Sequence, residues 1–157
     1  MPASYRRIRQ ACFLRPAFGT GGVIIGGDNF VKELEIRETG ERLGRNVSEA
    51  LTFFSRLRGL MLTESLPEGS GLHIRPCRSV HSFFMKYPID VLHLSQSGKV
   101  VGIEHRLQPG KVGKRFHGTF SIVELPEGTL ERAGAAIGQT VRFQDQDQTQ
   151  SEEELRC

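Results

Sequence analysis

The residues IDVLHLSQSGKVVGIEHRL, numbers 89 to 107, carry the clearest secondary-structure pattern in this chain of 157 residues. Two runs rich in Val, Ile and Leu flank a short QSGK segment, whose composition is typical of a tight turn between paired strands. The sequence therefore predicts a β-hairpin over residues 89–107.

Further strand and helix patterns lie on both sides of this hairpin. Strands are expected over residues 31–38, 43–47, 71–75, 80–85, 120–125 and 138–143. A helix is expected over residues 49–61, because apolar residues recur there at helical spacing after Ser48, which can cap the first turn. A second short helix, capped by Thr129, is expected over residues 129–136.

These elements predict an α+β fold made mainly of antiparallel strands. The strands should form a partly closed barrel or a strongly bent sheet, with the two short helices packed at its ends. The core is expected to contain Phe54, Leu60, Phe84, Ile89, Val91, Val101, Ile122 and Leu125.

One globular domain is predicted over residues 31–143, a length that a single hydrophobic core can fill. Residues 144–157 are rich in Gln, Asp and Glu and poor in apolar residues, so we expect a disordered acidic tail. Residues 1–30 lack a helix or strand period and are expected to lie outside the domain, as a flexible arm or as a basic arm that touches RNA or lipid. Alternatively, they precede the true start. Residues 26–31 are compatible with a bacterial ribosome-binding sequence before a GTG start codon at Val31.

The composition indicates which partners and which cellular compartment to expect. The formal net charge of +3 is spread along the sequence without a recognition motif, so nucleic acid is not expected as a partner. Apolar runs are far shorter than the roughly 20 residues that span a bilayer, so no membrane span is predicted. Three cysteines, an odd number without close pairing, favour a reducing compartment. These features predict a cytoplasmic protein.

Five sequence blocks occur in an order that resembles one known family. They are RGLM (58–61), LPEGSGL (66–72), FMKYPID (84–90), GKVV (98–101) and ELPEGT (124–129). Over residues 47–143 the chain is similar to domain-of-unknown-function family 192. The resemblance implies a small prokaryotic α+β domain, chiefly β, that is cytoplasmic or lipid-anchored and has no established activity. Many members have four residues where this chain has Tyr87 alone before the proline, so this loop is shorter and ligands inferred for those members need not apply.

The stretch PCRSVHSFFMKYPIDV, residues 76–91, concentrates the polar chemistry of the domain. Cys77, His81 and Met85 recur every four residues, and soft ligands of this kind suit copper. On the expected strand, however, positions four apart are separated by about 13 Å, too far for one ion, so no metal site is predicted. The same separation argues against a Cys77–His81 nucleophile pair. We expect a buried thiol, a satisfied histidine and a core methionine.

A candidate ligand site surrounds the Tyr-Pro turn that follows Lys86. Proline restricts the chain at this point, so Lys86 and Asp90 are held on either side of a rigid turn. We predict a cleft lined by His81, Lys86 and Asp90. Arg58 or the loop over residues 108–119 should form its rim. In the alternative interpretation Asp90 accepts backbone hydrogen bonds and Lys86 is solvated or ion-paired.

The predicted function is that of a non-enzymatic binding module for a small molecule or a polypeptide. No nucleophile–base pair, metal triad or phosphate loop is visible in the sequence, so no catalytic residue or cofactor is assigned. The alternative is a hydrolase or transferase of unrecognised type that uses His81, Lys86 and Asp90.

Overall fold

The computed structural model describes residues 31–50 and 64–145, and within these ranges the chain is mostly strand. The strands are β1 (Val31–Ile36), β2 (Arg42–Ala50), β3 (Ser70–Ile74), β4 (Ile89–Leu94), β5 (Val100–Leu107), β6 (Ser121–Pro126) and β7 (Val141–Asp145). One short helix, α2 (Thr129–Arg132), follows β6. The hairpin predicted over residues 89–107 is confirmed as the antiparallel pair β4–β5.

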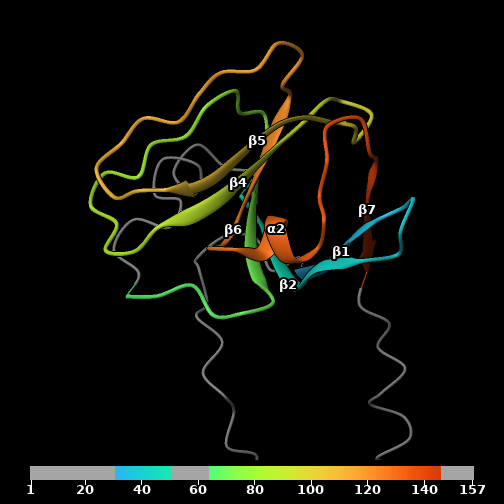
Figure 1. Ribbon diagram of the computed structural model, residues 1–157, viewed down its shortest axis with the longest axis horizontal. Coiled ribbons are helices and arrows are strands. Elements are labelled where there is room, and N and C mark those ends of the chain that lie inside the picture. Colours follow the sequence, from blue (N-terminus) through green and yellow to red (C-terminus); the bar gives the residue numbers. More distant parts are fainter. Residues whose placement is uncertain (1–30, 51–63, 146–157) are drawn as a thin grey trace, which may run out of the picture.

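All seven strands join one sheet in the order β5-β4-β6-β3-β2-β1-β7 (Figure 1). The sheet is mixed, because β2 and β3 pair in parallel, from Asn46 beside Ser70 to Ala50 beside Ile74. The other described pairings are antiparallel. The prediction of a mainly antiparallel sheet is therefore correct in outline and wrong for this one pair.

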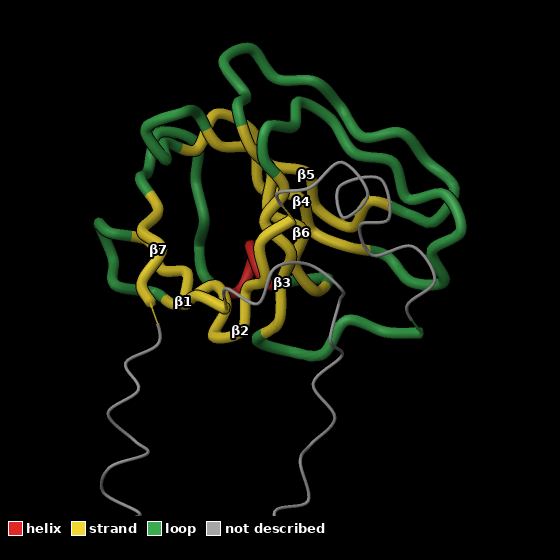
Figure 2. Tube along the Cα trace, turned by 180° about the vertical axis from the view of Figure 1, so that it is seen from behind, coloured by secondary structure: helices red, strands yellow, loops and turns green. Residues whose placement is uncertain are grey.

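The sheet curls into a half-barrel, and its two edges approach each other at one end (Figure 2). Lys99, before β5, forms an antiparallel bridge with Thr140, before β7. Val100 N donates to Gln139 O at 2.8 Å, and Val141 N donates to Gly98 O at 2.9 Å. These bonds join the two edges where β5 and β7 begin, so the predicted strong curl of the sheet is confirmed.

Buried apolar side chains form two clusters on opposite faces of the sheet. Val91 and Leu92 are neighbours on β4 but belong to different clusters, because successive strand residues point to opposite faces. The first cluster includes Leu34, Ile36, Leu43, Val47, Leu92, Leu94, Val123 and Leu125. The second includes Ala50, Leu72, Ile74, Val80, Met85, Ile89, Val91 and Ile122. Coverage on both faces explains why β4 and β6 are buried along their whole length.

The predicted core is partly correct. Ile89, Val91, Ile122 and Leu125 are fully buried, as expected. Val101 is only half-buried, and Phe84 is 74% exposed, which makes its prediction wrong. Phe54 and Leu60 lie outside the described residues.

The segment predicted as a strand over residues 80–85 is a loop. Met85 N donates to Ser82 O at 3.2 Å, which closes a turn with the two phenylalanines at its centre. The backbone of Ser82 bonds to residues 110 and 111 of another loop rather than to a strand. The residues of the apolar run from Val80 to Met85 therefore differ in burial. Val80 and Met85 are buried, whereas Phe83 and Phe84 are exposed.

Both predicted helices need correction. Ser48 and Glu49 belong to β2, which continues to Ala50, so Ser48 does not cap a helix. Residues 51–61 of that predicted helix lie outside the described residues. The second helix is shorter than predicted because Gly134 follows it with φ 61°, a left-handed conformation that ends helices. Gly128, not Thr129, occupies the N-cap position.

The predicted ends of the domain are described only in part. β7 includes Gln144 and Asp145, which pair with Glu33 and Lys32 of β1, so this strand ends two residues later than the predicted boundary at 143. Residues 1–30 and 146–157 lie outside the described residues. Within the described ranges, no helix is long and apolar enough to cross a membrane.

Candidate functional site

Two loops, residues 75–88 and 108–120, run side by side in opposite directions, and we call them the loop pair (Figures 1 and 2). Cys77 N donates to Phe120 O at 2.9 Å at one end of the pair. Further along, Gly113 N donates to Val80 O at 2.8 Å, and His81 bridges to Val112. The two loops therefore form one hydrogen-bonded unit.

Ser82 fastens the far end of the loop pair. Its side chain is fully buried, and Ser82 Oγ donates to Gln108 O at 2.6 Å. The same oxygen accepts from Lys111 N at 3.0 Å. Gly110 N donates to Ser82 O at 2.9 Å. A small hydroxyl residue at this position thus satisfies backbone groups that a buried loop would otherwise leave unpaired.

A buried polar pair on the sheet anchors the second loop. Both carboxylate oxygens of Glu104 accept from Lys114 N at 2.9 Å, and Glu104 Oε1 lies 3.1 Å from His93 Nε2. Burial lowers the pKa of His93, so a neutral imidazole can donate to the carboxylate. The ring of Phe116 covers His93 at a centroid distance of 4.6 Å. A Cβ on Gly102 would lie 2.2 Å from that ring, so glycine leaves the space that Phe116 fills.

The loop pair carries a one-sided charge. It contains six Lys and Arg residues and no Asp or Glu, whereas the remaining described residues hold eight Lys and Arg and thirteen Asp and Glu. Arg75 pairs with Glu49 and Lys86 with Glu64. The other four cations, which are Arg78, Lys111, Lys114 and Arg115, form no ion pair with any described residue. The folded domain therefore has a basic face that its small net charge conceals.

Exposed apolar side chains lie at the far end of the loop pair. Phe83 is 41% exposed, Phe84 74% and Val112 67%. The ring of His81 stacks on Phe83 at a centroid distance of 5.0 Å. We call the tip the set of His81, Phe83, Phe84, Lys86, Lys111 and Val112. Phe84 has φ 63°, a left-handed conformation that disfavours residues with a side chain and costs about 1–2 kcal/mol.

The structure treats the four predicted site residues differently. His81 and Lys86 both lie in the first loop of the loop pair and belong to the tip. His81 Nδ1 is buried without a hydrogen-bond partner. Lys86 is exposed and pairs with Glu64. Asp90 is 0% exposed, and its carboxylate accepts from Arg106 N and Leu130 N, each at 3.0 Å. Arg58 lies outside the described residues. That His81, Lys86 and Asp90 line one cleft stays a prediction, and the bonds of Asp90 agree with its alternative structural role.

Sequence reasoning missed a buried ionic cluster around Glu49. Its Oε1 lies 3.5 Å from both Lys32 Nζ and His73 Nδ1, and its Oε2 lies 3.3 Å from Arg75 NH2. The ring of His73 stacks on Phe143 at 4.3 Å. Burial lowers the pKa of His73 to about 4 against the opposing pull of Glu49. No sequence motif marks this cluster, because Lys32, Glu49 and His73 come from three different strands and Arg75 from the loop after β3.

Glu124 on β6 is a second buried acid that the sequence did not single out. It is flanked by Leu72 of β3 and Val91 of β4, and its Oε2 has no hydrogen-bond partner. Burial raises the pKa of Glu124 to about 8, so its carboxyl is protonated at neutral pH. Shifted pKa values occur both in functional sites and in structural networks. Among the described residues, no group of three or more His, Cys, Asp or Glu side chains could hold a metal ion.

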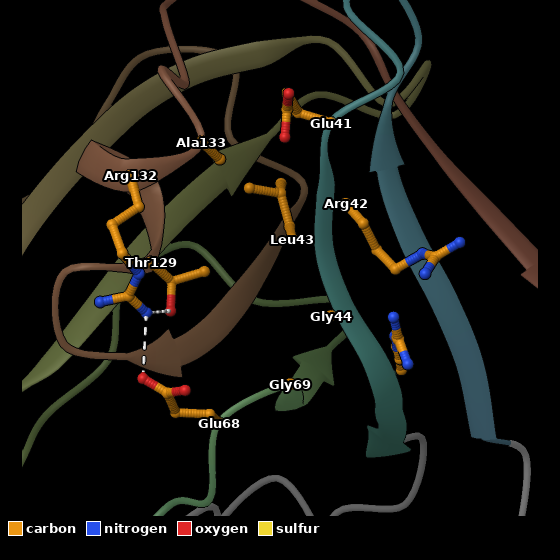
Figure 3. A pocket seen from close by; sticks show the side chains of 10 residues that line it. Glu41, Arg42, Leu43, Gly44, Glu68, Gly69, Thr129, Arg132 and Ala133 are labelled. Atoms are coloured by element: carbon orange, nitrogen blue, oxygen red, sulfur yellow. Dashed lines mark hydrogen bonds and ion pairs between the residues drawn. The ribbon is translucent and has the colours of Figure 1, made fainter.

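A surface pocket of about 490 Å³ lies between β2, the turn at Gly69 and α2 (Figure 3). Leu43 and Ala133 lie between its two charged sides, and two of the arginines that line it, Arg42 and Arg132, are ion-paired. Arg132 approaches Glu68 at 3.7 Å, and Arg42 points away from the pocket toward Glu33 at 3.4 Å. The loop pair therefore presents more cations without an ion pair to an anionic ligand than this pocket does.

The fold and the loop pair define a class of protein: a small half-barrel of strands whose exposed cations and aromatic side chains lie on two loops joined by hydrogen bonds. Residues 34–143 match the domain-of-unknown-function family 192 (DUF192), described as "Uncharacterized ACR", and the chain belongs to this family. The resemblance recognised in the five sequence blocks is confirmed.

Individual relatives support the same assignment. A UPF0127 protein of Thermococcus sibiricus (strain DSM 12597 / MM 739) is 35% identical over 106 residues, which cover 62% of this chain and 66% of that protein. The chain thus spans just under two thirds of that relative.

Two solved structures share the fold at low identity. A protein of unknown function from Novosphingobium aromaticivorans DSM 12444 has a TM-score of 0.60 at 17% identity, covering 71% of this chain and 83% of that one. A proposed transcription regulator from Sinorhizobium meliloti 1021 has a TM-score of 0.61 at 19% identity, covering 75% and 98%. These likenesses concern the fold alone.

Proposed function

We propose that this protein is a non-enzymatic binding module whose tip docks an acidic polypeptide segment that also carries apolar side chains. The observation that carries the proposal is the position of two exposed phenylalanines, Phe83 and Phe84, on a tip whose charged residues, Lys86 and Lys111, are both cations. Aromatic anchors surrounded by polar residues are typical of the energetic centres of protein interfaces.

The rigidity of the loop pair supports this proposal. Binding costs free energy when side chains and loops must be ordered, and a surface that is ordered beforehand avoids part of that cost. The bonds of Ser82 to Gln108 and Lys111 hold the tip loop in one arrangement before any partner arrives. The left-handed backbone of Phe84 is also in keeping with a functional surface, since such strain is common at ligand clamps.

The charge of the loop pair selects the chemistry of the partner. Lys111 lies next to exposed Val112, and Lys86 follows two residues after Phe84, so apolar and cationic groups alternate over a short distance. Acidic side chains on a partner would meet Lys111 and compete with Glu64 for Lys86, while its apolar side chains cover the rings. Complementary charge raises association rates and excludes partners of the wrong sign.

The alternative of a hydrolase or transferase using His81, Lys86 and Asp90 receives less support. A general base needs a carboxylate or imidazole within hydrogen-bond reach of the substrate. Both oxygens of Asp90 are engaged by backbone N–H groups in the interior, and Lys86 is paired with Glu64.

The test uses fluorescence anisotropy with a labelled peptide of Glu and Asp residues that contains two leucines. The full chain should bind it with an affinity that falls as salt rises. Phe84→Ser should weaken binding about tenfold or more. The matched control is Ile137→Ser, since Ile137 is 65% exposed but lies outside the loop pair.

Three results of the peptide experiment would contradict the proposal. They are absence of binding, equal binding of a peptide in which serine replaces the leucines, and equal weakening by both variants. Binding to anionic lipid vesicles without binding to the peptide would also overturn it, because it would assign the tip to a membrane surface.

A further inference from the structure

A second cavity, of about 530 Å³, opens at the other end of the loop pair. We call it the base cleft; its lining includes Arg78, Gln96, Arg115, Phe116, Thr119 and Phe120. The loops run in opposite directions, with Cys77 bonded to Phe120 at this end and Ser82 bonded to Lys111 at the tip. The base cleft is therefore distinct from the tip.

The charge of the base cleft suits an anion. Arg78 comes from the first loop and Arg115 from the second, and neither forms an ion pair with a described residue. None of the eight lining residues is acidic. Guanidinium groups bind phosphate and carboxylate through paired hydrogen bonds, so two unpaired arginines in one cleft favour an anionic group there.

The aromatic side of the base cleft is rigid. Phe120 N donates to Leu94 O at 2.8 Å, and Cys77 N donates to Phe120 O at 2.9 Å, so the backbone of this residue is fixed on both sides. Its side chain nevertheless remains 39% exposed. The neighbouring turn is held by Thr119, whose N and Oγ1 both donate to Phe116 O, at 3.2 and 2.9 Å. An exposed phenylalanine on a fixed backbone offers a flat apolar surface for a planar ring.

We infer that the base cleft binds a nucleoside phosphate. The phosphate would lie between Arg78 and Arg115, and the base would stack against Phe120. The amide of Gln96, on the turn between β4 and β5, can donate to and accept from the edge of the base. A volume of about 530 Å³ is in the usual range for a ligand of this size. This small-molecule site is separate from the polypeptide surface proposed above and depends on different residues.

Calorimetry on the full chain tests the inference with AMP, ribose 5-phosphate and inorganic phosphate at one ionic strength. AMP should bind saturably. Ribose 5-phosphate and inorganic phosphate, which lack a base, should bind at least about tenfold more weakly than AMP. Arg78→Gln and Arg115→Gln should each weaken AMP binding about tenfold. The matched control Arg37→Gln changes an exposed arginine on the turn after β1 and should leave binding unchanged.

Phe120→Leu keeps the apolar volume and removes the aromatic ring, so it serves beside Phe120→Ala if the alanine variant does not fold. Both should weaken AMP binding while leaving phosphate binding as it was. Phe84→Ser, at the tip, should leave AMP binding intact even if it abolishes peptide binding, so the two proposals fail separately. Equal affinity for AMP and inorganic phosphate, or AMP binding that survives both arginine changes, would overturn the inference.

Discussion

Ser82 and Lys111 hold each other by backbone and side chain at once. Ser82 N donates to Lys111 O at 2.8 Å, and Lys111 N donates to Ser82 Oγ at 3.0 Å. The two residues belong to different loops and are joined across the tip of the loop pair. This contact makes the basic and aromatic tip a property of two loops together.

Replacing Ser82 by alanine should therefore loosen the tip. Ser82→Ala removes the acceptor of Lys111 N and the donor to Gln108 O in a fully buried position. Leaving buried backbone groups unpaired costs about 1–3 kcal/mol. Urea unfolding should show this loss, and hydrogen exchange of the Lys111 amide should become faster.

The control for this change is Ser97→Ala, because Ser97 is exposed and its hydroxyl contacts Ser95 Oγ at 3.0 Å. It should change the free energy of unfolding by less than about 0.5 kcal/mol. Equal effects of the two variants would show that Ser82 does not fasten the loops.

Asp90→Asn should destabilise the protein by about 1–3 kcal/mol. The carboxylate accepts from Arg106 N and Leu130 N with its two oxygens. An asparagine replaces one acceptor with an NH2 group, which faces a backbone donor. Chemical denaturation measures the loss, with Asp145→Asn as the control because Asp145 is 92% exposed. A stable Asp90→Asn protein that loses ligand binding would instead favour the predicted site role.

Phe84→Gly should leave the free energy of unfolding unchanged or raise it slightly. Glycine adopts φ near +63° without the steric cost that phenylalanine bears, and a ring that is 74% exposed contributes little to the core. Thermal unfolding provides the measurement. A marked loss of stability would mean that the Phe84 ring has a structural role. That result would argue against the tip as a binding surface.

Glu124→Gln should stabilise the protein increasingly as pH rises from about 4.5 to 8. The folded-state pKa of Glu124 is raised to about 8 from its ordinary 4.5, so the unfolded chain releases a proton in this window that the folded chain keeps. The free energy of unfolding of the wild-type protein therefore falls as pH rises, by at most about 1.4 kcal/mol for each pH unit. A glutamine at this position does not titrate, so the variant does not show this loss.

The difference in unfolding free energy between the Glu124→Gln protein and wild type should be small below pH 4.5 and level off above pH 8. Glu41→Gln is the control, because Glu41 is exposed. A difference that does not depend on pH would show that Glu124 is ionised in the folded protein.

Local patterns determined much of the fold before any tertiary contact was considered. The hairpin over β4 and β5, the strands near residues 31, 71, 121 and 141, and the core positions Ile89, Val91, Ile122 and Leu125 all follow from alternation and turn residues. These features were predictable because a strand and its turn are encoded by neighbours in the sequence. Family membership was also predictable, since it rests on the order of short motifs.

The apolar run from Val80 to Met85 shows where local patterns stop. Its composition is that of a strand, but the turn at Ser82 and the second loop divide it into buried ends and exposed rings. The basic face was missed for the same reason. In the sequence Arg78 lies far from Lys111, Lys114 and Arg115, and only the pairing of their loops gathers the charge on one surface. Alternation encodes which residues form strands, but long-range hydrogen bonds place the loops, and the side chains exposed on those loops set the binding chemistry.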